Sequence, residues 1–68
     1  MSSDYWYDHR DELEPEMCFR MYDDSTIKLD RRVPGDGTQW YVAILYKFGW
    51  CYEDTRIEPG DLAERIFI

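Results

Sequence analysis

The sequence predicts an α+β fold: a small antiparallel sheet of about four strands, with short helices at its N- and C-terminal ends. Three observations lead to this prediction. Between residues 16 and 52, several stretches alternate apolar and polar side chains, as strands with one buried face do. Clusters of turn-forming residues separate these stretches, and both ends of the chain have spacings typical of short helices. With 68 residues the chain forms a single small acidic domain, residues 1–68.

The N-terminal segment is expected to form the first helix. Ser3 can act as the N-cap, and Asp4 complements the positive end of the helix dipole. The residues Trp6, His9, Arg10 and Leu13 have the spacing of one helix face. Pro15 ends this helix, because a residue that precedes proline avoids the helical conformation. The aromatic run at the start also suits a strand, which is the alternative.

Two strands joined by a tight turn are expected next. Residues 16–22 alternate, and their inward side chains are Met17, Phe19 and Met21. Residues 23–25 are Asp-Asp-Ser, which favours a turn. Residues 26–29 resume the alternation, so the two segments predict a hairpin.

A loop and the central strand follow. Residues 33–38 contain one proline and two glycines, the strongest loop signal in the chain. Residues 39–48 are apolar on both faces, which indicates a strand that is central in the sheet or covered on both sides. Trp40, Val42, Ile44, Tyr46 and Phe48 share one of these faces. Gly49 then turns the chain into a returning strand over residues 50–53.

The C-terminal segment is expected to be helical. Leu62 and Ile66 are i, i+4 partners, and Asp61 can cap a turn that contains them. Strongly bent, the whole sheet would be a small SH3-like barrel; an open sheet is the alternative. Cys18 and Cys51 lie in two of the expected strands and could be neighbours, although free thiols are more common inside cells.

Charge is distributed unevenly along the chain. Fifteen acidic and eight basic residues give a net charge of −7, and residues 1–24 alone hold eight of the acidic residues against two arginines. Aromatic residues of the type that anchors interfaces lie among these acids. We expect a binding surface for a basic partner there. Its candidate residues are Asp4, Tyr5, Trp6, Tyr7, Asp8, Asp11, Glu12, Glu14, Glu16, Asp23 and Asp24.

The expected helix would also order these carboxylates. Asp4, Asp8 and the pair Asp11/Glu12 would repeat at about one helical turn, roughly 5.4 Å. Phosphates along one DNA strand rise by about 3.4 Å each and form a broadly similar anionic row. Such a row is expected to attract a surface built to hold DNA.

No catalytic set and no cofactor or metal site is recognisable in the sequence. His9 is the only histidine and lacks a nucleophile in a recognisable context. The cysteine spacing does not suit zinc, and the chain has no Asp-rich calcium loop. We therefore expect a non-enzymatic protein without metal or cofactor; a small metal-dependent enzyme is the alternative.

Direct binding to nucleic acid is not expected. The basic residues Lys28, Arg31, Arg32 and Lys47 form a small cluster, but the net negative charge of the whole chain repels phosphate. These cations are instead expected to pair with carboxylates of the N-terminal segment. No signal peptide or membrane span is visible, so we expect no membrane partner and a cytoplasmic location, as a monomer or small homo-oligomer.

In size, acidity, aromatic content and lack of a catalytic set, the chain resembles the small DNA-mimicking inhibitors that phages and mobile elements produce, the anti-CRISPR and anti-restriction proteins. The resemblance is one of overall character and involves no shared motif. It implies a non-catalytic inhibitor that occupies the nucleic-acid-binding surface of a host defence complex. The alternative is an SH3-like protein-interaction or structural domain that works through Trp40, Trp50 and Tyr52, with acids that serve solubility.

Overall fold

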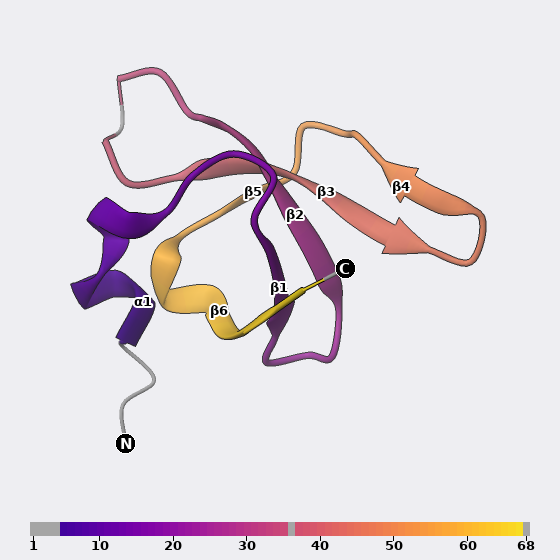
Figure 1. Cartoon of the computed structure of the whole chain (residues 1–68). Helices are drawn as coiled ribbons and strands as arrows, with labels where there is room; N and C mark the ends of the chain where they lie inside the picture. The colour runs from indigo at the N-terminus through magenta and orange to yellow at the C-terminus, as the bar shows by residue number, and fades with distance from the viewer. Residues whose placement is uncertain (1–4, 36, 68) are drawn as a thin grey trace.

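A computed structural model describes residues 5–35 and 37–67, and six strands form one antiparallel sheet within this part (Figure 1). The strand order is β4-β3-β2-β1-β6, and β5 pairs with β3 farther along the same edge as β4. The strands are β1 (Cys18–Met21), β2 (Thr26–Arg32), β3 (Trp40–Tyr46), β4 (Gly49–Cys51), β5 (Arg56–Ile57) and β6 (Leu62–Ile66). The helical elements are α1 (Tyr5–Asp8) and the 3₁₀ turns η1 (Arg10–Glu12) and η2 (Pro59–Asp61). The expected antiparallel sheet is confirmed, with six strands rather than about four.

The N-terminal helix is shorter than the spacing predicted. α1 ends at Asp8, and after His9 the chain continues as the 3₁₀ turn η1. A short helix is costly to nucleate, and aromatic residues, histidine and aspartate are weak helix formers. Leu13 is extended and buried, so the helical segment ends before Pro15 as expected. The predicted capping residues Ser3 and Asp4 lie outside the described residues.

The predicted C-terminal helix is wrong, because residues 62–66 form strand β6. β6 runs antiparallel to β1, with pairs such as Phe19↔Arg65, and buries Leu62 completely. One or two helical turns would not provide this backbone pairing, so the long-range ladder prevails over local helix propensity. Asp61 was predicted to cap a turn that follows it in the chain. Instead, its carboxylate accepts a hydrogen bond from the backbone N–H of the preceding Glu58 at 3.0 Å.

The expected turn between the first two strands is confirmed. The carboxylate of Asp23 accepts the backbone N–H of Ser25 at 2.9 Å, as in an Asx turn. Asp24 has a positive φ of 71°, a conformation that aspartate tolerates better than most residues. The backbone N–H of Met21 donates to the carbonyl of Ser25 at 2.8 Å and closes the hairpin.

One face of the bent sheet supplies the core. Its buried cluster comprises Leu13, Met17, Phe19, Ile27, Leu29, Trp40, Val42, Ile57 and Leu62. From outside the sheet, Trp6 of α1 packs edge-on against the ring of Phe19, with 4.9 Å between ring centroids. No charged or polar side chain is buried among the described residues. The core is therefore built from apolar side chains, as the alternation of β1 to β3 predicted, and its buried polar atom in the described part is the indole N–H of Trp40, which has no hydrogen-bond partner.

The two cysteines are free and lie far apart in the sheet. Cys18 is in β1 and Cys51 in β4, with β2 and β3 between them. Three strand spacings of about 4.8 Å separate them by about 14 Å, whereas a disulfide needs Cα atoms within about 7 Å. A disulfide between them would require the sheet to come apart.

Phe19 is fully buried, so its shortening tests the core directly. We expect Phe19→Leu to lower the free energy of unfolding by about 1–2 kcal/mol, because the edge contact with Trp6 is lost and a void remains. Urea denaturation followed by circular dichroism measures the change. Arg20→Leu on the exposed side of the same strand is the control and should shift stability by less than about 0.5 kcal/mol. Equal losses in both variants would contradict this assignment of the core.

Candidate functional site

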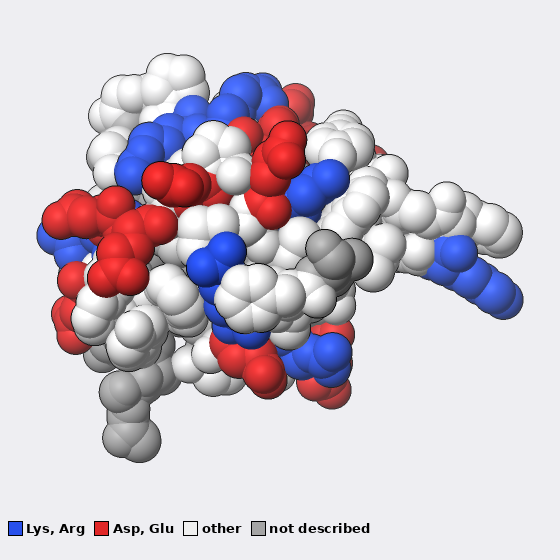
Figure 2. Space-filling view, viewed as in Figure 1, with Lys and Arg blue, Asp and Glu red and all other residues white. Residues whose placement is uncertain are grey.

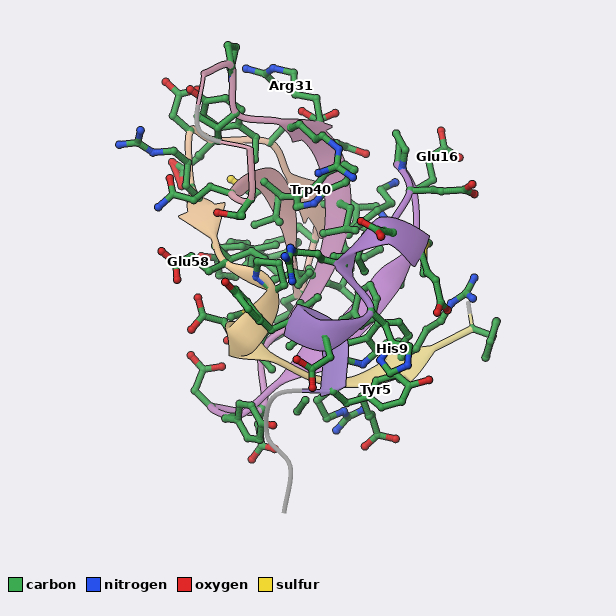
Figure 3. The ribbon with its side chains drawn as sticks, turned by 90° about the vertical axis from the view of Figure 1, so that its left-hand side faces the viewer. Tyr5, His9, Glu16, Arg31, Trp40 and Glu58 are labelled. Atoms are coloured by element: carbon green, nitrogen blue, oxygen red, sulfur yellow. The ribbon has the colours of Figure 1, made fainter. Side chains whose placement is uncertain are left out.

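The N-terminal segment forms an acidic surface, which we define as Asp8, Asp11, Glu12, Glu14 and Glu16 with the adjoining Tyr5 and Tyr7. All five carboxylates are exposed, and the two tyrosines are 50% and 45% exposed. In the space-filling view of Figure 2, acidic side chains gather over the N-terminal helical turns. Most of the predicted site residues therefore lie on the N-terminal segment, and Figure 3 shows Glu16 at its far end, well apart from Tyr5.

Aromatic contacts hold this segment on the sheet. Trp6 is partly buried and packs against the core, so its ring is used inside the molecule. Tyr5 contacts Trp6 edge-on at 4.9 Å and stacks on His9 at 4.1 Å between ring centroids. Figure 3 shows Tyr5 and His9 side by side on this flank. Tyr5 and Tyr7 are thus the exposed aromatic residues of the predicted site, and Trp6 is their support.

Glu16 connects the acidic surface to the sheet in a strained conformation. Its backbone N–H donates to the carbonyl of Leu29 in β2 at 2.8 Å. Its φ is 76°, in the left-handed region that disfavours a residue with a long side chain. The chain accepts this conformation where it turns from the N-terminal segment into β1, and the Glu16 side chain remains exposed.

The regular row of carboxylates is not formed. Because α1 ends at Asp8 and η1 has 3₁₀ geometry, Asp8, Asp11 and Glu12 do not repeat along one α-helix. Asp4, the first member of the predicted row, lies outside the described residues. Any likeness of this surface to DNA is therefore one of charge rather than of helical spacing.

Asp23 and Asp24 lie apart from the acidic surface. They occupy the β1–β2 turn, whereas Glu16 lies before the opposite end of β1. The hydrogen bond from the backbone N–H of Ser25 lowers the pKa of Asp23 below its usual value. This carboxylate therefore has a structural partner, and the two aspartates form a second, smaller acidic site.

Five of the eight basic residues contact aromatic rings, and in the described part none of the predicted cluster forms an ion pair with an N-terminal carboxylate, which contradicts the predicted pairing. Cations lie 4.2–4.8 Å from ring centroids in the pairs Arg10–Tyr7, Lys28–Trp50, Arg31–Tyr41, Arg32–Trp40 and Arg65–Phe67. Within residues 5–35 and 37–67, the ion pair that forms is Arg31 with its neighbour Asp30, at 2.7 Å. Cation–π contacts satisfy much of the positive charge locally. No carboxylate of the acidic surface forms an ion pair in the described part, and Lys28 acts on Glu16 only as a more distant charge.

A second candidate surface is the β3–β4 hairpin, which projects from the body of the molecule (Figure 1). Exposed large apolar side chains on it are Leu45, Tyr46, Phe48 and Tyr52. The alternation predicted Tyr46 and Phe48 on the buried face with Trp40. However, the last registered pair of β2 and β3 toward the hairpin tip is Ile27↔Ile44, so the later residues extend beyond the core. The sequence could not predict this exposure, because it does not show that β3 extends beyond the end of its pairing with β2.

Lys28 lies at the base of the hairpin on its outer face. Its ammonium is 4.6 Å from the ring centroid of Trp50 and 5.4 Å from that of Tyr52. A hydrogen bond with the hydroxyl of Tyr52 raises the pKa of Lys28. The cation therefore occupies the space between these two rings, both of which the sequence had singled out for a protein-interaction surface.

The described part of the chain contains no group of three His, Cys, Asp or Glu side chains placed to hold a metal ion. No pocket is found in it either. No helix among the described residues is long and apolar enough to cross a membrane. Comparisons with protein families, curated proteins and solved structures gave no match for this chain.

The positive φ of Glu16 can be tested by its effect on stability. We expect Glu16→Gly to raise the free energy of unfolding by about 0.5–1 kcal/mol, since glycine adopts a positive φ without penalty. Glu14→Gly is the matched control. It removes an equally charged side chain at a position without positive φ and should lower stability by up to about 1 kcal/mol. Thermal denaturation measures both; a Glu16→Gly variant less stable than wild type would contradict the strain.

Proposed function

We propose that this chain is a non-catalytic binding protein, a phage-type inhibitor of the anti-CRISPR kind that acts in the host cytoplasm. Its acidic surface would occupy the nucleic-acid-binding surface of a host defence complex. One observation carries this proposal. Five of the eight basic residues lie on aromatic rings, and the five exposed carboxylates of the acidic surface form no ion pair in the described part.

Charge supports a basic partner. A carboxylate in an internal ion pair must break that pair before it binds a partner, which costs free energy. The carboxylates of the acidic surface have no ion pair to break in the described part. Arg and Lys side chains that normally hold phosphates can form charge-assisted hydrogen bonds with these carboxylates. The summed field of the chain, with its net charge of −7, would steer such a partner and speed association at low salt. Tyr5 and Tyr7 would add apolar contact area beside the charges.

The chemistry of the described residues favours binding over catalysis. A carboxyl group that acts as a general acid near neutral pH needs a pKa raised by burial, but no carboxylate among the described residues is buried and the pKa of Asp23 is lowered. Partial burial and the neighbouring Glu53 raise the pKa of the Cys51 thiol, which makes it a weaker nucleophile. These properties suit a protein that acts by occupying a surface.

A second candidate function is an SH3-like protein-interaction domain. The bent meander, in which β6 returns to pair with β1, supports the SH3-like interpretation of the sheet. The exposed hairpin favours this function, because Phe48 at its tip is 97% exposed. Here the hairpin would bind the partner, and the acidic surface would serve solubility.

Reversal of two adjacent charges tests the leading proposal. We expect Asp11→Lys/Glu12→Lys to weaken binding to the host complex at least tenfold, because it removes attraction and adds repulsion at the contact. The matched control, Glu53→Lys/Asp54→Lys, reverses another exposed adjacent pair and gives the same net charge. It should bind within about threefold of wild type. Circular dichroism checks that both variants fold.

The measurement is an affinity pull-down from host lysate with immobilised protein, washed at rising salt. A nucleic-acid-binding complex that elutes as salt rises and is lost in the Asp11/Glu12 variant is the expected result. Equal retention by both variants would sink the proposal. If, in addition, Phe48→Ser abolished retention, the interaction-domain function would replace it.

A further inference from the structure

We propose that the outer face of the sheet, the side that does not supply the core, binds single-stranded nucleic acid. Strand register and ring contacts place three basic and three aromatic side chains together on this side of β2, β3, β4 and β5. We call them the basic–aromatic face, and they are Lys28, Arg31, Tyr41, Trp50, Tyr52 and Arg56. The proposal goes beyond the inhibitor function and concerns a different surface.

One end of the basic–aromatic face is built around Tyr41. Tyr41 pairs with Arg31 of β2 on one side and with Arg56 of β5 on the other. Paired residues of neighbouring strands share a face, so the two arginines flank one ring. The guanidinium of Arg31 lies 4.2 Å from the ring centroid of Tyr41 and forms an ion pair with Asp30. Arg56 is exposed and forms no ion pair in the described part.

The other end of the face is built around Lys28. Ala43, two residues along β3 from Tyr41, pairs with Lys28, so Lys28 and Tyr41 lie on the same side of the sheet. The Lys28 ammonium is 4.6 Å from the ring centroid of Trp50 and 5.4 Å from that of Tyr52. Ala43 is fully buried without belonging to the core cluster, which agrees with a cover of larger side chains on the outer face. Tyr52 itself remains 59% exposed.

The charge near this face differs from that of the whole chain. Residues 37–52, which supply β3, β4 and all three rings, contain no acidic residue. The nearby acids are Asp30, which is paired with Arg31, and Glu16, which acts on Lys28 as a more distant charge. In the view of Figure 1, α1 and β4 lie on opposite sides of the molecule.

The expectation that the chain does not bind nucleic acid rested on its net charge of −7. At about 0.1 M salt, charges farther away than about 10 Å are largely screened. A ligand in contact with the basic–aromatic face therefore responds mainly to the cations of that face.

The mixture of rings and cations favours nucleic acid over an acidic peptide. Cations hold phosphates, and aromatic rings and guanidinium planes stack bases, whereas an acidic peptide would use the cations alone. From Tyr41 to Leu45, the β3 partner of Trp50, the face extends about 13 Å, which suits two or three nucleotides. Bases must be unpaired to lie on the rings, so the ligand is single-stranded.

Three cations predict weak and salt-sensitive binding. If about three phosphates are neutralised, the logarithm of the binding constant falls against the logarithm of the salt concentration with a slope of about −2. We expect a dissociation constant of about 10–100 μM at low salt, in the range of binding without sequence preference.

Fluorescence anisotropy of a labelled strand of about ten nucleotides, oligo(dT) or oligo(U), tests the proposal between about 20 and 200 mM salt. Arg56→Gln should weaken binding about threefold or more at low salt and make the slope shallower by about 0.7. Arg65→Gln is the matched control. It removes another exposed strand arginine, on β6 and away from β3, and should bind within about twofold of wild type.

A second variant tests stacking. Tyr52→Leu keeps an apolar side chain but removes a ring, so it should weaken binding at least fivefold with an unchanged salt slope. Tyr22→Leu is its control, because Tyr22 is also 59% exposed but lies in the β1–β2 turn; it should bind within about twofold of wild type. A duplex of the same length should bind more weakly than the single strand. Circular dichroism checks that all variants fold.

Three results would each overturn the proposal: no binding by wild type at the lowest salt, equal losses in the two arginine variants, and no loss in Tyr52→Leu. If a polyglutamate peptide bound as tightly as the oligonucleotide and Tyr52→Leu had no effect, the face would be a site for acidic peptides instead. Asp11→Lys/Glu12→Lys should retain oligonucleotide binding. The present proposal and the inhibitor proposal can therefore fail separately.

Discussion

The double pairing of β1 is the constraint on which the structure depends. This strand of four residues has β2 along one edge and β6 along the other, and Phe19 at its centre is fully buried. Through the Phe19–Trp6 contact it also positions α1. The two ends of the chain, far apart in sequence, are therefore attached through one short strand. For a domain of this size, whose hydrophobic core is small, such shared contacts make folding an all-or-none event.

The partition of charge follows from the aromatic content. Rings that lie beside the sheet attract guanidinium and ammonium groups, and they do so without using carboxylates. In an acidic chain with fewer aromatic residues, the basic side chains would pair with carboxylates instead. Those carboxylates would then be unavailable to a binding partner. Here positive charge is distributed over the sheet and negative charge stays available at the N-terminal segment. The same aromatic residues thus support the fold and the electrostatic asymmetry.

The sequence pattern predicted the strands and turns that depend on residues close together in the chain. Alternation identified the inward residues Phe19, Ile27 and Leu29, and Asp23-Asp24-Ser25 identified the turn. The C-terminal helix was wrong because β6 exists only through its long-range pairing with β1, which no spacing within residues 57–66 reveals. Among the site residues, most acids could be assigned to one surface from composition alone. The internal role of Trp6 and the exposure of Phe48 could not, since both depend on where the sheet begins and ends.

The strand that follows the hairpin tip is interrupted, and the interruption has a consequence for motion. β4 and β5 both pair with β3, but residues 52–55 between them lie outside either ladder, and Thr55 rejoins through its carbonyl to the N–H of Val42 at 3.0 Å. Beyond Ile44 the hairpin is a two-stranded ribbon, which has little stability of its own in water. The ribbon can therefore open while β1, β2 and β6 stay closed, as a unit of local unfolding. Its backbone amides would exchange hydrogen with solvent sooner than those of the inner strands, and anything that binds the ribbon would slow that exchange.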